Sequence, residues 1–122
     1  MTIRQERSNL ALAAAVRYYA AFGRVFIPVG DSGRYDFLVD TKDKILRIQV
    51  KYTSRTTSAG NFIVALATRT CRKNGERLSF NYVQTDFDFM FVLCSDGSEH
   101  VVSINEVIGK DSYVIRRVSS SR

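Results

Sequence analysis

The sequence predicts an α+β fold in which an N-terminal helix packs on one face of a mixed β-sheet. Residues 8–21 are rich in alanine and place apolar side chains on one side of a helix. Three short apolar segments follow at 24–29, 34–40 and 45–53, separated by turn residues, and further strand segments continue beyond them. The 122 residues suit one domain. We place it at residues 1–118, with 119–122 as a frayed C-terminus.

Local signals set the expected boundaries of these elements. Ser8 or Asn9 can cap the helix, and Gly23 suits the region of its C-terminus. Pro28 moves the segment 24–29 toward a sheet edge or a bulge. The rest of the chain is predicted as a strand at 61–68, a charged connection at 69–78 around the turn Asn74-Gly75, strands at 87–95 and 99–104, a helical turn at 105–108, and a last strand or arm at 112–118.

The charge distribution indicates a polyanionic partner. The chain has 18 Lys and Arg against 12 Asp and Glu, a net charge of +6. Between Lys51 and Arg77 there are six basic residues and one acidic residue, Glu76, so this segment alone carries +5. A concentrated basic segment suits DNA, although it is also compatible with a solvated basic loop.

Other classes of protein are disfavoured by the composition. No apolar run approaches the ~20 residues of a membrane helix, and the first residues do not form a signal peptide, so we expect a cytoplasmic protein. Cys71 and Cys94 are far apart in the sequence and match no metal-ligand spacing.

Three polar residues on two neighbouring predicted strands form the candidate catalytic motif. Asp36 interrupts the apolar segment 34–40, where a charge needs a partner. Gln49 and Lys51 share one face of the segment 45–53, because successive side chains of a strand point to opposite faces. A hairpin would bring Asp36 beside them. A carboxylate, an amide oxygen and a lysine suit a divalent metal that promotes attack on a phosphodiester.

These residues carry a resemblance to a known family. The stretch GDSGRYDFLVD…LRIQVK resembles the core of PD-(D/E)XK nucleases in its Q-x-K form, and it is most similar to the bacterial homing endonucleases encoded in group I introns. The resemblance implies a restriction-endonuclease-like core, sequence-specific cleavage of double-stranded DNA, and Mg²⁺ as cofactor. It also implies a bacterial cytoplasmic location.

The resemblance assigns roles to the motif. Asp36, Gln49 and the backbone carbonyl of Val50 would hold the metal, and Lys51 would stabilise charge on the attacked phosphate. Each side chain also has a purely structural interpretation: Asp36 bonded to Arg34 or to a backbone amide, Gln49 on a solvent face, and Lys51 as a surface lysine.

The wider family also implies an acidic metal ligand on the first helix. In this chain the expected position is occupied by Ala11, and the helix segment 8–21 has no carboxylate. Two explanations compete. Glu6, just before that segment, takes the role; or the sequence carries an inactivating replacement of an acid by alanine, of the kind made to trap uncut DNA. We favour the second.

The resemblance and the basic segment together predict how DNA is bound. Basic residues around the Asn74-Gly75 hairpin tip would read bases in the major groove, and the others would contact phosphate. Because one domain has one site, cutting both strands calls for a homodimer or homotetramer. A Holliday-junction-resolvase-like nuclease and a non-catalytic nucleic-acid-binding module remain alternatives. The predicted DNA contacts are Arg34, Lys51, Arg55, Arg69, Arg72, Lys73 and Arg77.

Overall fold

The computed structural model describes residues 1–30, 34–71, 74–75 and 77–116, without the side chains of 68–71 and 77–79. The predicted frayed end, 119–122, lies outside these residues. The described elements are one helix, a short 3₁₀ turn and nine strands: α1 (Ile3–Ala20), β1 (Arg24–Phe26), β2 (Phe37–Asp40), β3 (Ile45–Thr53), β4 (Phe62–Ala65), β5 (Thr68–Cys71), β6 (Arg77–Phe80), β7 (Phe89–Cys94), β8 (Glu99–Ser103), η1 (Ile104–Glu106) and β9 (Ser112–Ile115).

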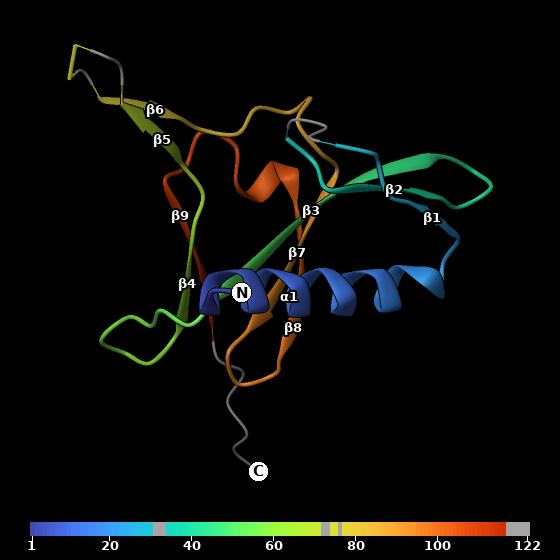
Figure 1. The fold of residues 1–122 in the computed structure, drawn as a ribbon, viewed down its shortest axis with the longest axis horizontal. Helices are drawn as coiled ribbons and strands as arrows, with labels where there is room; N and C mark the ends of the chain where they lie inside the picture. Colours follow the sequence, from blue (N-terminus) through green and yellow to red (C-terminus); the bar gives the residue numbers. More distant parts are fainter. Residues whose placement is uncertain (31–33, 72–73, 76, 117–122) are drawn as a thin grey trace.

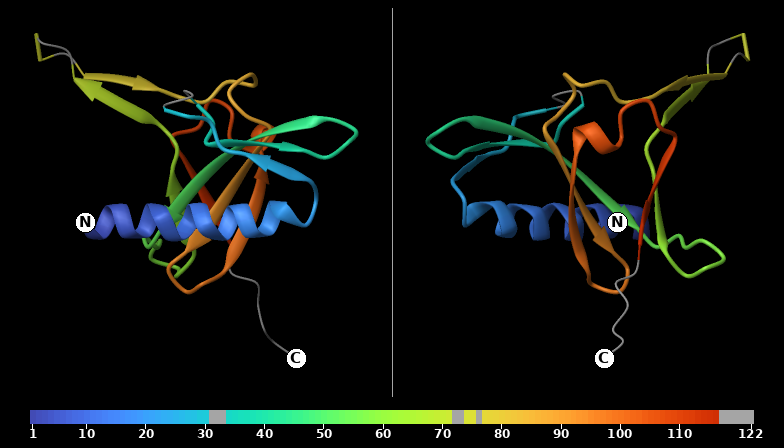
Figure 2. Two further views of the ribbon diagram at one scale, coloured as in Figure 1. Left: turned by 45° about the vertical axis from the view of Figure 1, so that its right-hand side comes forward. Right: turned by 180° about the vertical axis from the view of Figure 1, so that it is seen from behind.

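The predicted mixed sheet with an N-terminal helix is confirmed. Five strands form the main sheet in the order β1-β2-β3-β7-β8, in which only β3 and β7 are parallel. Helix α1 crosses one face of this sheet (Figure 1). Strands β4 and β9 form a separate antiparallel pair. The antiparallel pair β5–β6 projects away from the rest of the chain in all three views (Figures 1 and 2).

Two hydrophobic clusters hold the layers together. On the helix side, Ala15 and Tyr19 of α1 pack against Phe37, Ile48 and Phe91. The opposite face of the sheet packs against β4 and β9, through a cluster of buried residues: Phe62, Val64, Leu66, Tyr82, Phe87, Met90, Val92, Cys94, Val102, Ile104, Val107 and Ile115. Strand β3 therefore lies between two layers, and its alternate side chains face different clusters.

Helix α1 begins five residues earlier than predicted. Its N-cap is Thr2, whose hydroxyl accepts a hydrogen bond from the Gln5 amide at 3.2 Å, while the Gln5 side chain accepts one from the Thr2 amide at 2.8 Å. This capping box satisfies backbone donors that would otherwise be exposed at the helix start. Ser8 and Asn9 therefore lie inside the helix, in its second turn.

Several strands are shorter than the apolar segments that predicted them. Residues 34–36 lie outside β2, so the strand begins after the motif carboxylate. The predicted connection 69–78 contributes most of the β5–β6 hairpin. Glycine is needed at position 23 because the chain there packs directly against the backbone of Asp40: a Cβ would lie 2.1 Å from the Asp40 carbonyl oxygen. Among the described residues, no helix is long and apolar enough to cross a membrane.

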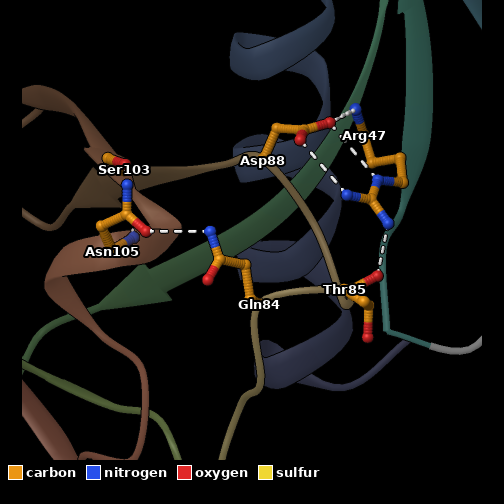
Figure 3. Close-up of polar contacts among 6 residues, drawn as sticks. All are labelled: Arg47, Gln84, Thr85, Asp88, Ser103 and Asn105. Atoms are coloured by element: carbon orange, nitrogen blue, oxygen red, sulfur yellow. Dashed lines mark hydrogen bonds and ion pairs between the residues drawn. The ribbon is translucent and has the colours of Figure 1, made fainter.

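An ion pair fixes the start of β3 against the segment before β7 (Figure 3). The Arg47 amide and side chain both donate to the Asp88 carboxylate, at 2.7 Å from the amide and 3.2 Å from Nη2, and the guanidinium also donates to the Thr85 carbonyl. Burial alone would raise the pKa of Asp88, but these hydrogen bonds outweigh it and hold that pKa below its usual value. The contact fixes β3 two residues before Gln49.

Candidate active site

The candidate site lies where β2 and β3 separate. The last paired residues are Phe37 and Ile48, so Asp36 and Gln49 are the next pair in register. The Asp36 amide donates to the Ile48 carbonyl at 2.7 Å. Two residues after Ile48, the exposed Asp36 side chain accepts the next hydrogen bond of β3: its Oδ2 accepts from the Val50 amide at 2.7 Å. The carboxylate is thereby fixed at the edge of the sheet.

The carbonyl of Val50 points to the same edge. Along a strand, the N–H and C=O of one residue point to the same side, and successive residues point to opposite sides. The Val50 amide faces Asp36, so the Val50 carbonyl faces the gap beyond Asp36 as well. The carbonyl of Thr53, three residues later, accepts a hydrogen bond on the β7 side. The structure thus brings a carboxylate and a carbonyl oxygen to one strand edge.

Gln49 and Lys51 lie on the sheet face opposite to α1. Their register partners in β7 are Met90 and Val92, which are buried in the cluster on that face. Both motif side chains are half-buried. The Lys51 ammonium lies 5.8 Å from the ring centroid of Tyr82, a position that suits a cation–π contact. Neither side chain lines the cavity that Asp36 shares with α1, so the motif side chains lie on two faces of β3.

Ala11 occupies the helix position that faces Asp36. A cavity of about 210 Å³ between α1 and the sheet is lined by both residues, and Ala11 is 1% exposed. Glu6 does not line this cavity: it is exposed in the first turn of the helix. Five residues along a helix correspond to about 500° of rotation, so Glu6 points about 140° away from Ala11. Of the two helix candidates, only Ala11 shares a cavity with Asp36.

The donors at this edge suit a hard divalent cation, although they bring little charge. Asp36, the Gln49 amide and the Val50 carbonyl are all oxygen ligands of the type that Mg²⁺ accepts. Only Asp36 among them is anionic. No group of three or more His, Cys, Asp or Glu side chains in the described part of the chain could hold a metal. With alanine on the helix, the donor set is chemically suitable and electrostatically weak.

Arg34, predicted to contact DNA, contacts two other residues of the chain in this structure. Its guanidinium lies over the Tyr82 ring, 4.6 Å from the centroid, and forms an ion pair with Asp86 at 3.6 Å. The side chain is 32% exposed. These contacts hold the guanidinium against Tyr82, on the same ring that Lys51 approaches.

The remaining predicted DNA contacts divide into two groups. Lys51 and Arg55 line a groove of about 750 Å³ between the first turns of α1 and strands β3 and β4. The other four lie in the sequence between the start of β5 and the start of β6. Arg69 lies on β5 and Arg77 on β6, and the structure describes only their backbone. Arg72 and Lys73 lie outside the described residues.

Sequence reasoning missed two members of this groove, Arg4 and Arg7. The signal was present. Thr2 followed by Gln5 is a capping-box pattern, and a helix starting at Ile3 places Arg4, Arg7 and Ala11 on one face, by the i, i+3, i+7 spacing. Starting the helix at Ser8 concealed that shared face.

Comparison with known proteins identifies the family of the chain. The sequence profile of PD-(D/E)XK endonucleases matches residues 5–122, and the chain belongs to this family. It is therefore a DNA endonuclease; such enzymes generally use divalent metal ions. No curated protein matches its sequence. A similar solved structure is that of a bacterial homing endonuclease, I-Ssp6803I, with a TM-score of 0.84 and 19% identity over 99% of this chain and 83% of that one. This likeness supports the restriction-endonuclease-like fold.

Proposed function

We propose that this endonuclease is a magnesium-dependent, sequence-specific enzyme that cuts double-stranded DNA, as a homing endonuclease of a bacterial group I intron. The observation that carries the proposal is the strand edge at which the Asp36 carboxylate is held by the Val50 amide, next to Gln49 and Lys51. The fold likeness to a homing endonuclease supports the biological class. We place the enzyme in the cytoplasm, where its DNA target lies.

Asp36, Gln49 and the Val50 carbonyl would hold Mg²⁺ at this edge. When bound, the ion lowers the pKa of a coordinated water and neutralises charge on the scissile phosphate. The Val50 amide orients the Asp36 carboxylate, so that little reorganisation is needed. Lys51 supplies a point charge toward the phosphate from the other face of β3. Its contact with Tyr82 limits the positions its ammonium can adopt.

DNA contacts are proposed on two sides of this edge. Lys51 and Arg55 line the groove beside it and would contact phosphate. Bases in the major groove would be read by Arg69 and Arg77 of strands β5 and β6 and by Arg72 and Lys73, which lie between them in the sequence. One chain carries one site, so cutting both strands requires a homodimer or homotetramer.

Alanine at position 11 favours a form with weakened catalysis. A site with one carboxylate binds Mg²⁺ weakly, while the basic groove does not depend on the metal. We therefore expect slow or absent cleavage together with retained DNA binding. A Holliday-junction nuclease shares the motif, but no observation on this structure favours it.

The proposal is tested with a duplex library that contains random sites. Binding is measured by fluorescence anisotropy in EDTA, and cleavage is followed over long incubations with Mg²⁺. We expect binding without metal and at most slow, Mg²⁺-dependent cleavage, which Asp36→Asn abolishes and the exposed-turn control Asp43→Asn leaves unchanged. Cleavage that proceeds equally in EDTA, or survives Asp36→Asn, would overturn the assignment of the site.

A further inference from the structure

The groove beside the active-site edge has a one-sided charge. Its twelve lining residues come from α1, β3, the following loop and β4, and they include four basic and no acidic residues. The basic residues are Arg4, Arg7, Lys51 and Arg55. None of them takes part in the ion pairs of the described residues, which join Arg17 to Glu99, Arg34 to Asp86 and Arg47 to Asp88.

Arg7 is held in place within this groove. Its guanidinium lies over the Tyr52 ring at 5.4 Å from the centroid, and its side chain is half-buried. Stacking of this kind restricts an arginine while leaving its edge donors available. Arg4 is exposed one helical turn before it. Residues three apart on a helix are neighbours on one face, with Cβ atoms about 5–6 Å apart.

The groove borders the cavity in front of Asp36. Ser8, Val50 and Tyr52 line both of them. Val50 is also the residue whose amide fixes the Asp36 carboxylate. A chain of phosphates whose scissile group lies at this edge would therefore have its neighbours beside the first two turns of α1.

We propose that Arg4 and Arg7 extend the groove lined by Lys51 and Arg55 into a phosphate-binding track for the DNA strand that flanks the scissile phosphate. The ligand class is the phosphodiester backbone of a duplex, read without regard to base sequence. Arg7 is the fixed contact and Arg4 the exposed one. The inference rests on the proposed function for the position of the scissile phosphate, but its residues are separate from the metal motif.

The test measures the salt dependence of DNA binding. A random-sequence duplex is titrated in EDTA at several KCl concentrations with the wild-type chain, Arg4→Gln, Arg7→Gln and the double variant. The control is Arg17→Gln, which removes the same charge from the same helix at an exposed site outside the groove, where Arg17 pairs with Glu99. Each lost phosphate contact reduces the slope of log K against log salt by about one. We expect the slope to fall by about one in Arg4→Gln, by about one in Arg7→Gln and by about two in the double variant, and to stay unchanged in Arg17→Gln. Arg7→Lys should recover most of the slope.

The outcomes separate the inference from the proposed function. Salt-dependent binding by the wild type with unchanged slopes in Arg4→Gln and in the double variant would overturn the track and leave the nuclease proposal standing. An equal loss in Arg17→Gln would also overturn it, since bulk charge would then explain the effect. No salt-dependent binding by the wild type would overturn both. Arg4 is exposed, so its variant remains informative if changes at the stacked Arg7 disturb folding.

Discussion

Placing a carboxylate at position 11 should turn a weak metal site into a strong one. Ala11 lines the cavity that also contains Asp36, so Ala11→Glu adds a second anionic oxygen ligand from the helix face. The cavity of about 210 Å³ is far larger than the ~10–15 Å³ that one water requires. The added side chain would therefore displace solvent rather than protein atoms.

The magnitude follows from Coulomb's law. A carboxylate and a divalent cation 4 Å apart attract each other by about 8 kcal/mol at an effective dielectric constant of 20. If desolvation of the new carboxylate and its repulsion from Asp36 cancel about five sixths of this, the remaining ~1.4 kcal/mol corresponds to tenfold tighter metal binding. Without metal, the added carboxylate is nearly buried and unpaired, so Ala11→Glu should be less stable than the wild type. Metal at 100 times its Kd would then return about 2.7 kcal/mol.

Calorimetric titration with Mg²⁺, thermal unfolding with and without Mg²⁺, and cleavage of a duplex library measure these effects. Two controls separate charge from shape and position. Ala11→Gln has nearly the same shape without the charge, and Ala13→Glu places the same charge on the exposed side of α1. We expect the tenfold gain, the metal-dependent melting temperature and the faster cleavage in Ala11→Glu alone.

Equal metal affinity in Ala11→Glu and Ala13→Glu would refute the placement of the helix ligand. A second result would place the helix ligand in the first turn instead. In that result the wild type already cleaves DNA, Ala11→Glu gains no activity, and Glu6→Ala loses the activity. In that case Glu6 would supply the ligand, and α1 would have to be rotated relative to the sheet so that Glu6 faces Asp36.

Two further predictions concern stability and specificity. Asp88→Asn should lower the free energy of unfolding at pH 7 by about 1–2 kcal/mol, because hydrogen bonds to a charged group are lost. The folded-state pKa of Asp88 is depressed, so the stability that its carboxylate adds above pH ~4 is lost as pH falls through that pKa. Denaturant titrations at pH 7 and pH 3 should therefore show that Asp88→Asn loses less stability in acid than the wild type or the control Asp43→Asn. Arg72→Ala should cost roughly 1–3 kcal/mol of specific binding and relax preference at one base pair; unchanged selection from a random library in both Arg72→Ala and Arg69→Ala would remove the hairpin as the base reader.

The architecture could be predicted because the sequence repeats apolar residues at the spacing of a helix in one segment and of strands in others. The alternation along residues 45–53 predicted β3 at its observed bounds, and it predicted that Gln49 and Lys51 share a face. The start of α1 could not be found from alanine content alone, because the capping box at Thr2 determines it. Propensity describes the interior of a helix, whereas its end depends on a few side chains that bond to the backbone.

The arrangement of the candidate site depended on tertiary structure that periodicity does not encode. Asp36 belongs to an apolar segment, which predicts a strand residue; in the fold it lies just outside β2, and its carboxylate takes the hydrogen bond that a longer strand would have made. A strand that continued would have paired the Val50 amide and carbonyl with backbone and closed the edge. Early termination of β2 is therefore what leaves an acid, a carbonyl and the face of Ala11 together at one opening. The same opening borders the arginine-lined groove, so the proposed catalysis and the proposed phosphate binding both depend on the position at which two strands separate.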